Sequence, residues 1–235
     1  MKQLLVLSMA VAATGWTQTP PVRGTISGVL NGEDGSAIAG GTIKLHLVQR
    51  DSPKFARQTT DWAAVSGTGG AFQFVGLTEG SYTLCPRVPN STWLNPCEWN
   101  FPTPTATISR SIPNPNVTIT LKVGATVPIR IDDAGQSLEK NEGKTPGAGL
   151  LLGVSSPGFF FHTVPLSSKD SNGRNYQIIV PFNIQLTLVL HSAFYHVNDA
   201  NGGALSRSSS TKIPLLIATG QKVPPIKFAI SGVGH

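Results

Sequence analysis

Charge is scarce in this chain of 235 residues. Charged residues make up 13% of the sequence, about half of the usual quarter. The 18 Lys and Arg outnumber the 12 Asp and Glu, which gives a formal net charge of +6, but the basic residues stand singly and form no runs. Because nucleic-acid binding requires a clustered positive surface, we expect no nucleic-acid partner.

The sequence also lacks long apolar stretches. No segment reaches the ~18 uninterrupted apolar residues that a membrane-spanning helix needs, so we expect no integral membrane span. The first residues combine Lys2, the apolar run Leu4–Ala13 and small residues after it, which is typical of a secretory signal peptide. We therefore predict a signal peptide over residues 1–17 and a secreted protein, extracellular or periplasmic.

Motifs of known catalytic sites are missing. None of the five histidines begins a His-x-x-Glu pair, so the zinc carboxypeptidase pattern is excluded. The sequence contains no Gly-x-Ser-x-Gly elbow, no phosphate-binding loop and no dinucleotide fingerprint. We expect no enzyme activity, no metal site and no cofactor. A glycan-acting enzyme of unrecognised motif is the alternative.

The few carboxylates stand in patterns that favour structural roles. Asp132 and Asp133 are adjacent in a predicted strand and should point to opposite faces, which makes them poor partners in acid–base chemistry. Asp170–Gly173 and Asp199–Gly202 resemble the opening of a calcium loop, but each lacks the downstream bidentate Glu. The same residues also make good β-turns, because Asn and Gly accept positive φ.

Glycine and proline, by contrast, are abundant, with 25 Gly and 18 Pro. Both disfavour helix interiors, and the segments between them are short runs of alternating apolar and polar residues, which indicate β-strands. The sequence therefore predicts an all-β protein of two tandem β-sandwich domains, prealbumin-like or Ig-like, over residues 22–125 and 126–235 after the signal peptide. The candidate strands are Gly24–Leu30, Thr42–Val48, Ala71–Phe74, Ser81–Cys85, Thr118–Val123, Val127–Ile131, Leu150–Val154, Phe159–Val164, Tyr176–Val180, Ile184–His191, Ile213–Ala218 and Lys227–Ile230.

Two stretches of the first half are more specific. One is the Ala-Gly-Gly-Thr-Ile run over Ala39–Ile43, and the other is the pattern G-x-F-x-F-x-G-L-x-x-G-x-Y-T-L over Gly70–Leu84. Over residues 22–125 the chain resembles carboxypeptidase-regulatory-like (transthyretin-like) domains of secreted bacterial proteins. The resemblance implies a seven-stranded prealbumin-like sandwich. It implies no single function, because such folds serve many roles.

Cys85 and Cys97, the two cysteines of the chain, lie where the sequence departs from that pattern. An even cysteine count in an exported protein predicts a disulfide, which adds about 2–3 kcal/mol by closing the loop between them. Trp93, Trp99 and Phe101 lie in or beside this loop. We predict that these three rings form a ligand-binding platform on a rigid loop. The alternative is that they pack the loop onto the sandwich.

Taken together, these features favour a secreted non-catalytic protein that acts as a structural, adhesion or binding module. Its partner is expected to be a protein or a carbohydrate, and homo-oligomers are possible. A subunit of an extracellular filament or surface assembly is an alternative, for which the segment from Asn114 to Val123 offers a possible edge strand.

Overall fold

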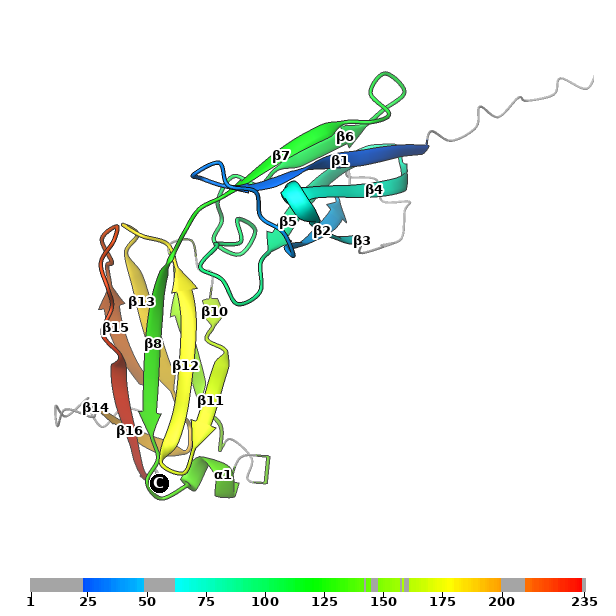
Figure 1. The fold of residues 1–235 in the computed structure, drawn as a ribbon. Helices are drawn as coiled ribbons and strands as arrows, with labels where there is room; N and C mark the ends of the chain where they lie inside the picture. The colour runs from blue at the N-terminus through cyan, green and yellow to red at the C-terminus, as the bar shows by residue number, and fades with distance from the viewer. Residues whose placement is uncertain are drawn as a thin grey trace, which may run out of the picture.

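A computed structural model describes residues 23–48, 62–141, 143–144, 148–156, 158, 161–199 and 210–233. The signal peptide expected over residues 1–17 lies outside them. The described chain forms two β-sandwiches, one after the other (Figure 1). The all-β prediction with two tandem sandwiches is thus confirmed. No helix among the described residues is long and apolar enough to cross a membrane.

The first sandwich consists of a three-stranded and a four-stranded sheet, in the orders β4-β1-β7 and β3-β2-β5-β6. These are seven strands, as the resemblance implies. Their bounds are β1 (Arg23–Gly32), β2 (Thr42–Leu47), β3 (Trp62–Val65), β4 (Ala71–Thr78), β5 (Gly80–Arg87), β6 (Thr105–Ile108) and β7 (Asn116–Leu121), with a short 3-10 turn at Thr68–Gly70 before β4.

The alternating pattern of the first half correctly predicts its core. Phe72 and Phe74 point inward from β4, and Tyr82 and Leu84 point inward from β5; each is at most 5% exposed. The corner over Gly76–Gly80 joins two strands that do not pair with each other. β4 and β5 belong to different sheets, so the corner carries the chain across the sandwich, and both strands bury their apolar face in the core between the sheets.

The second sandwich pairs a four-stranded sheet, β10-β9-β13-β15, with a five-stranded sheet, β11-β12-β8-β16-β14. The strands are β8 (Ala125–Asp132), β9 (Leu151–Ser155), β10 (Phe161–Thr163), β11 (Leu166–Asp170), β12 (Gly173–Val180), β13 (Leu186–His191), β14 (Tyr195–Asp199), β15 (Ser210–Leu215) and β16 (Ile226–Val233). Asp170–Gly173 forms the turn between β11 and β12 that the sequence predicts.

The charged, Gly-rich sequence Glu139–Gly149 overlaps a helix at its start. A short helix, α1 (Ser137–Asn141), runs into it, and Leu138 of this helix is fully buried in the second core. The helix starts where Asp133 accepts hydrogen bonds from the backbone N–H groups of Ser137 and Leu138, at 2.8 and 2.9 Å. A single buried leucine in a polar, Gly-rich stretch leaves too short a periodicity to be recognised from sequence.

The chain crosses from the first sandwich to the second without a break in its strand pattern. Ile119 and Leu121 of β7 are buried, and so are Val127, Ile129 and Ile131 of β8, all at odd positions. The inward phase of period two is therefore kept across residues 122–124. Figure 1 shows β7 leading directly into β8 between the two lobes.

Two neighbouring glycines before β4 differ in how closely they approach β1. Gly69 and Gly70 both have positive φ, 73° and 74°. A Cβ on Gly69 meets nothing within 4 Å, whereas on Gly70 it lies 2.3 Å from the carbonyl oxygen of Leu30 on β1. Gly69→Ala is expected to cost about 1 kcal/mol through backbone strain alone. Gly70→Ala is expected to cost about 2–4 kcal/mol, because β1 must also shift. Urea unfolding measures both, and equal losses would contradict this packing.

Candidate functional site

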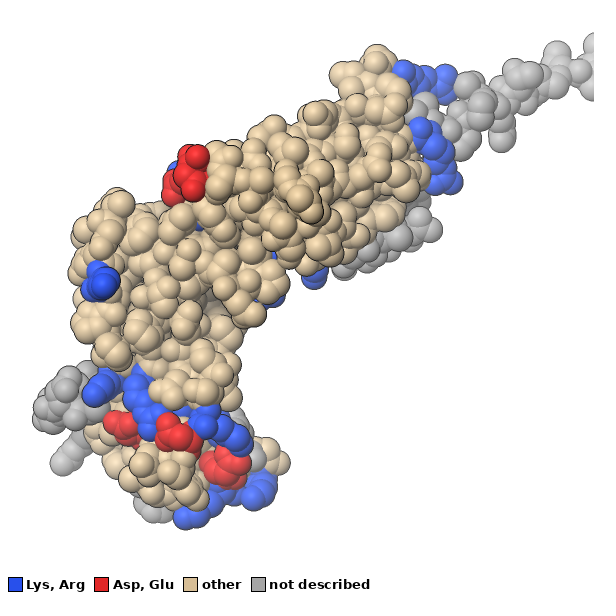
Figure 2. Space-filling view, viewed as in Figure 1, with Lys and Arg blue, Asp and Glu red and all other residues tan. Residues whose placement is uncertain are grey.

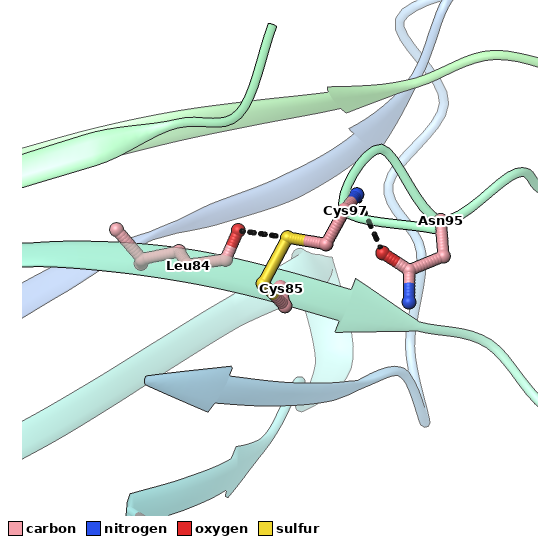
Figure 3. Close-up of a disulfide and its surroundings, with 4 residues drawn as sticks. All are labelled: Leu84, Cys85, Asn95 and Cys97. Carbon is pink, nitrogen blue, oxygen red and sulfur yellow. Dashed lines mark hydrogen bonds between the residues drawn. A yellow bond between two sulfur atoms is a disulfide. The ribbon is translucent and has the colours of Figure 1, made fainter. Parts of the chain in front are cut away.

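The disulfide between Cys85 and Cys97 anchors the segment of residues 88–101, which we call the disulfide loop. Cys85 lies on β5, and its Cα is 5.6 Å from that of Cys97. Figure 3 shows Cys97 held from both sides: its backbone N–H donates to Oδ1 of Asn95 at 3.0 Å, and its sulfur lies 3.9 Å from the carbonyl oxygen of Leu84. The loop is thus fixed against the end of β5.

Hydrogen bonds within the loop give it a defined shape. The carbonyl oxygen of Asn95 accepts the N–H groups of Glu98 and Trp99, at 3.1 and 3.2 Å. Ser91 donates its hydroxyl to the carbonyl oxygen of Val88 at 2.8 Å, and the same hydroxyl oxygen lies 3.3 Å from the N–H of Trp93. These bonds satisfy backbone groups that a loop without regular structure would otherwise leave to water.

The loop pairs with the segment that joins the two sandwiches. The N–H of Leu94 donates to the carbonyl oxygen of Lys122 at 2.9 Å, and the N–H of Gly124 donates to that of Thr92 at 2.8 Å. Trp93 and Val123 face each other in an antiparallel bridge. Residues 92–94 thereby form a short ladder with residues 122–124, and we call this junction the joint.

Side chains of the loop enter both cores. Leu94 is 3% and Trp99 8% exposed, and both belong to the core of the second sandwich, although the loop follows β5 of the first. Trp93 packs instead against the first core. Phe101 packs partly against the second core, and Nζ of Lys122 lies 5.3 Å from its ring centroid. All three predicted ligand-binding rings therefore contact a core; their role in ligand binding stays a prediction.

Trp99 stacks on His162 of β10. The ring centroids are 3.9 Å apart and the planes are inclined by 30°. Nε2 of His162 is buried and has no hydrogen-bond partner. Burial lowers the pKa of His162 below its usual value, and the carboxylate of Glu98 acts in the opposite direction. The neutral imidazole suits this site, because a charged ring would lose its hydration without gaining a hydrogen bond at Nε2.

Gly124 shows how tightly the joint is packed. A Cβ at this position lies 2.7 Å from Leu94, from Ile179 and from the carbonyl oxygen of Val180. In the linker, residues 122–124, the N–H of Val123 also donates to Oε1 of Glu33 at 3.0 Å. The linker is thus enclosed by the loop, by β12 and by the turn after β1.

Charged side chains gather at the far end of the second sandwich, away from the joint (Figure 2). Arg130 donates to Asp132 at 2.8 Å and to both carboxylate oxygens of Asp170, at 2.5 and 3.0 Å. Lys169 pairs with Glu139 at 2.8 Å. A pocket here is lined by Glu139, Lys169 and Asp170 together with Asp133 and Arg174. The adjacent Asp132 and Asp133 have separate structural partners, Arg130 and the start of α1.

Two turns resemble calcium loops in sequence, and the structure describes the first of them, Asp170–Gly173, in full. Asp170 is engaged by Arg130, and its Oδ1 also accepts the N–H of Asn172 at 2.9 Å. Of Asp199–Gly202, the last three residues lie outside the described chain. Within the described residues, no group of three or more His, Cys, Asp or Glu side chains is arranged to hold a metal ion.

Comparison with known proteins finds distant likeness only. No protein-family model matches the sequence, and no curated protein is detectably similar. The likeness to carboxypeptidase-regulatory-like domains therefore stays a prediction.

Three solved structures illustrate how distant the likeness in shape is. A streptococcal ancillary pilin is 14% identical with a TM-score of 0.44; the alignment covers 91% of this chain and 64% of the pilin, so this chain spans less than two thirds of its length. The shaft pilin of Lactobacillus rhamnosus GG is 12% identical over 89% of this chain and 99% of its own, with a TM-score of 0.32. A putative carbohydrate binding protein of Pseudomonas aeruginosa is 15% identical over 44% and 92%, with a TM-score of 0.30. Likeness at this level carries no inference about function.

The stacked His162 generates a prediction on pH. Because its pKa is lowered in the folded protein, the unfolded chain binds a proton first as pH falls below about 6.5. The free energy of unfolding should therefore be highest above that pH and decrease as the pH falls through the lowered pKa. His162→Gln should remove this part of the decrease while changing stability at pH 8 much less. Urea unfolding from pH 8 to pH 5 measures it; parallel profiles for both proteins would contradict it.

Proposed function

We propose that this chain is a non-catalytic structural module that acts outside the cytoplasm, with its two sandwiches working as one stiff unit. Such a unit suits an adhesion protein or a subunit of a surface assembly, which must hold its ends at a fixed separation. The observation that carries the proposal is the disulfide loop, which follows β5 of the first sandwich and supplies Leu94 and Trp99 to the core of the second.

Three independent kinds of contact support a stiff joint. The covalent bond between Cys85 and Cys97 fixes the loop, the ladder between residues 92–94 and 122–124 ties it to the linker, and Leu94 and Trp99 fill the second core. Bending at the joint would expose these two side chains, and burial of one such side chain contributes about 2–3 kcal/mol. A flexible linker has none of these contacts and is rich in Gly and Ser.

The placement of the carboxylates supports the absence of catalysis. The general acid of a glycosidase needs a raised pKa. Here the hydrogen bond from Arg130 lowers the pKa of Asp170 to about 2, and that from Lys169 lowers the pKa of Glu139. Asp133 is occupied by the first turn of α1. Asp170 and Glu139 are paired with cations, and all three carboxylates hold the end of the sandwich together.

The disulfide also supports the proposed compartment. Structural disulfides persist in oxidising surroundings, such as the periplasm or the cell exterior, and are rare in the reducing cytoplasm. Cys85 and Cys97 are the two cysteines of the chain, and the structure joins them.

Calorimetry tests whether the sandwiches form one unit. Because Leu94 and Trp99 complete the second core from a loop of the first sandwich, the wild-type protein is expected to unfold in one cooperative transition. In the Cys85→Ser/Cys97→Ser variant the loop is released and two transitions are expected. Small-angle scattering should show a larger spread of overall dimensions for this variant.

A matched pair of leucine substitutions provides the control. Leu84→Ala removes a fully buried side chain from the first core, and Leu94→Ala removes one that is 3% exposed from the joint. Each is expected to cost about 2–5 kcal/mol, but only Leu94→Ala should separate the transitions. Two transitions in the wild-type protein would mean that the sandwiches unfold independently, and the proposal would then be wrong.

A further inference from the structure

Strand β7 lies at an edge of its sheet. Among the described strands it is hydrogen-bonded to β1 alone, in parallel. The carbonyl oxygens of Pro115 and Leu121 accept the N–H groups of Ser27 and Glu33, at 3.2 and 2.9 Å. Since successive peptide groups of a strand point in opposite directions, odd-numbered residues face β1. The N–H and C=O groups of Asn116, Thr118 and Thr120 therefore point out from the edge.

Edge strands usually carry features that prevent another strand from adding to them, such as charges, proline, bulges or short length. The other sheet edges of the described chain have them. β3 and β6 have four residues and β10 three; β4 has a bulge between Phe74 and Leu77, where Gly76 has positive φ; β11 contains Lys169 and Asp170; β15 contains Lys212 and Pro214; and β14 has a bulge at Tyr195/His196.

β7 has none of these features over its six residues, which read Asn-Val-Thr-Ile-Thr-Leu. Its β-branched residues favour an extended strand. Such an edge is a template for strand addition.

The surface around this edge is uncharged. The exposed side chains of β7 are Asn116, Thr118 and Thr120, and those of β4 on the same sheet include Gln73 and Val75. On β1 between them, the outward residues are Thr25, Ser27, Val29 and Asn31. In Figure 2 the broad surface of the first sandwich between its two ends is tan, with basic atoms only along its lower margin. A charged partner strand would lose hydration here and gain no opposite charge.

The open edge has a defined end. Beyond Leu121 the even-numbered Lys122 and Gly124 also point their backbone groups outward, but residues 92–94 of the disulfide loop already pair with them. The loop thus closes the edge at the joint, and the free part runs from Asn116 to Thr120. Five residues is the usual length of a strand in globular proteins.

We propose that the free edge of β7 is a docking site for an uncharged, extended segment of a partner polypeptide, which adds to the sheet as a fourth strand beyond β7. Backbone hydrogen bonds to Asn116, Thr118 and Thr120 hold this strand, and its uncharged side chains match the neutral face. Docking goes beyond the proposed stiffness and needs only a folded first sandwich, so one can fail without the other.

The test uses the full chain and a synthetic peptide that copies residues 115–121, with one lysine added at each end for solubility. Saturable binding is expected, and at saturation amide exchange at Thr118 and Thr120 should slow at least tenfold. The amides of Val117 and Ile119 already face β1 and should change little. Binding that leaves the Thr118 and Thr120 amides unprotected would overturn the proposal, as would no binding.

Two substitutions at one position separate backbone docking from side-chain contact. Thr118→Pro removes an N–H that points away from β1, a place where an edge strand tolerates proline, and should weaken peptide binding about tenfold or more. Thr118→Val keeps the backbone and should bind within about threefold of the wild type. Equal binding by both variants would overturn the proposal. Peptide-free association of the protein that Thr118→Pro abolishes would identify the partner strand as one from a second copy.

Discussion

The disulfide between Cys85 and Cys97 determines where residues 92–99 lie, and these residues connect the two halves of the molecule. Without the bond, this segment would have to be ordered by packing alone, at about 1–2 kcal/mol of backbone entropy for each residue. With the bond, the loop is already confined when Leu94 and Trp99 meet the second core. The covalent constraint thus supports non-covalent contacts that lie in a different sandwich.

The low charge of the chain is consistent with this arrangement. The joint buries a tryptophan against a histidine whose charged form is disfavoured, and the first sheet presents an uncharged outer face. The charged pairs around Arg130 lie at the opposite end of the second sandwich. Removing charged groups from water is costly, which favours uncharged side chains both at the joint and at the proposed docking edge.

Much of the fold follows from local sequence. The alternation in segments such as Thr25–Leu30 and Val127–Ile131 identifies their strands, since side chains that alternate between core and solvent leave a direct pattern. Four strands, β3, β6, β11 and β14, are not indicated by the sequence, and all four are short edge strands. β11 illustrates the reason: its five residues are all exposed, so no buried face leaves an alternating pattern.

The site depends on long-range packing, and here local sequence is insufficient. The pairing of the two cysteines follows from their number, but nothing near Trp99 in sequence indicates that it stacks on His162, some sixty residues later, in another sandwich. The amino-acid sequence of an apolar loop does not show whether its rings face solvent or pack against a neighbouring core. One sequence feature distinguishes the two in retrospect. The inward phase of β7 continues unchanged into β8, so the chain between them is extended and leaves the sandwiches too close for the loop beside it to remain exposed. A strand pattern that keeps its phase across a domain boundary therefore indicates a packed junction.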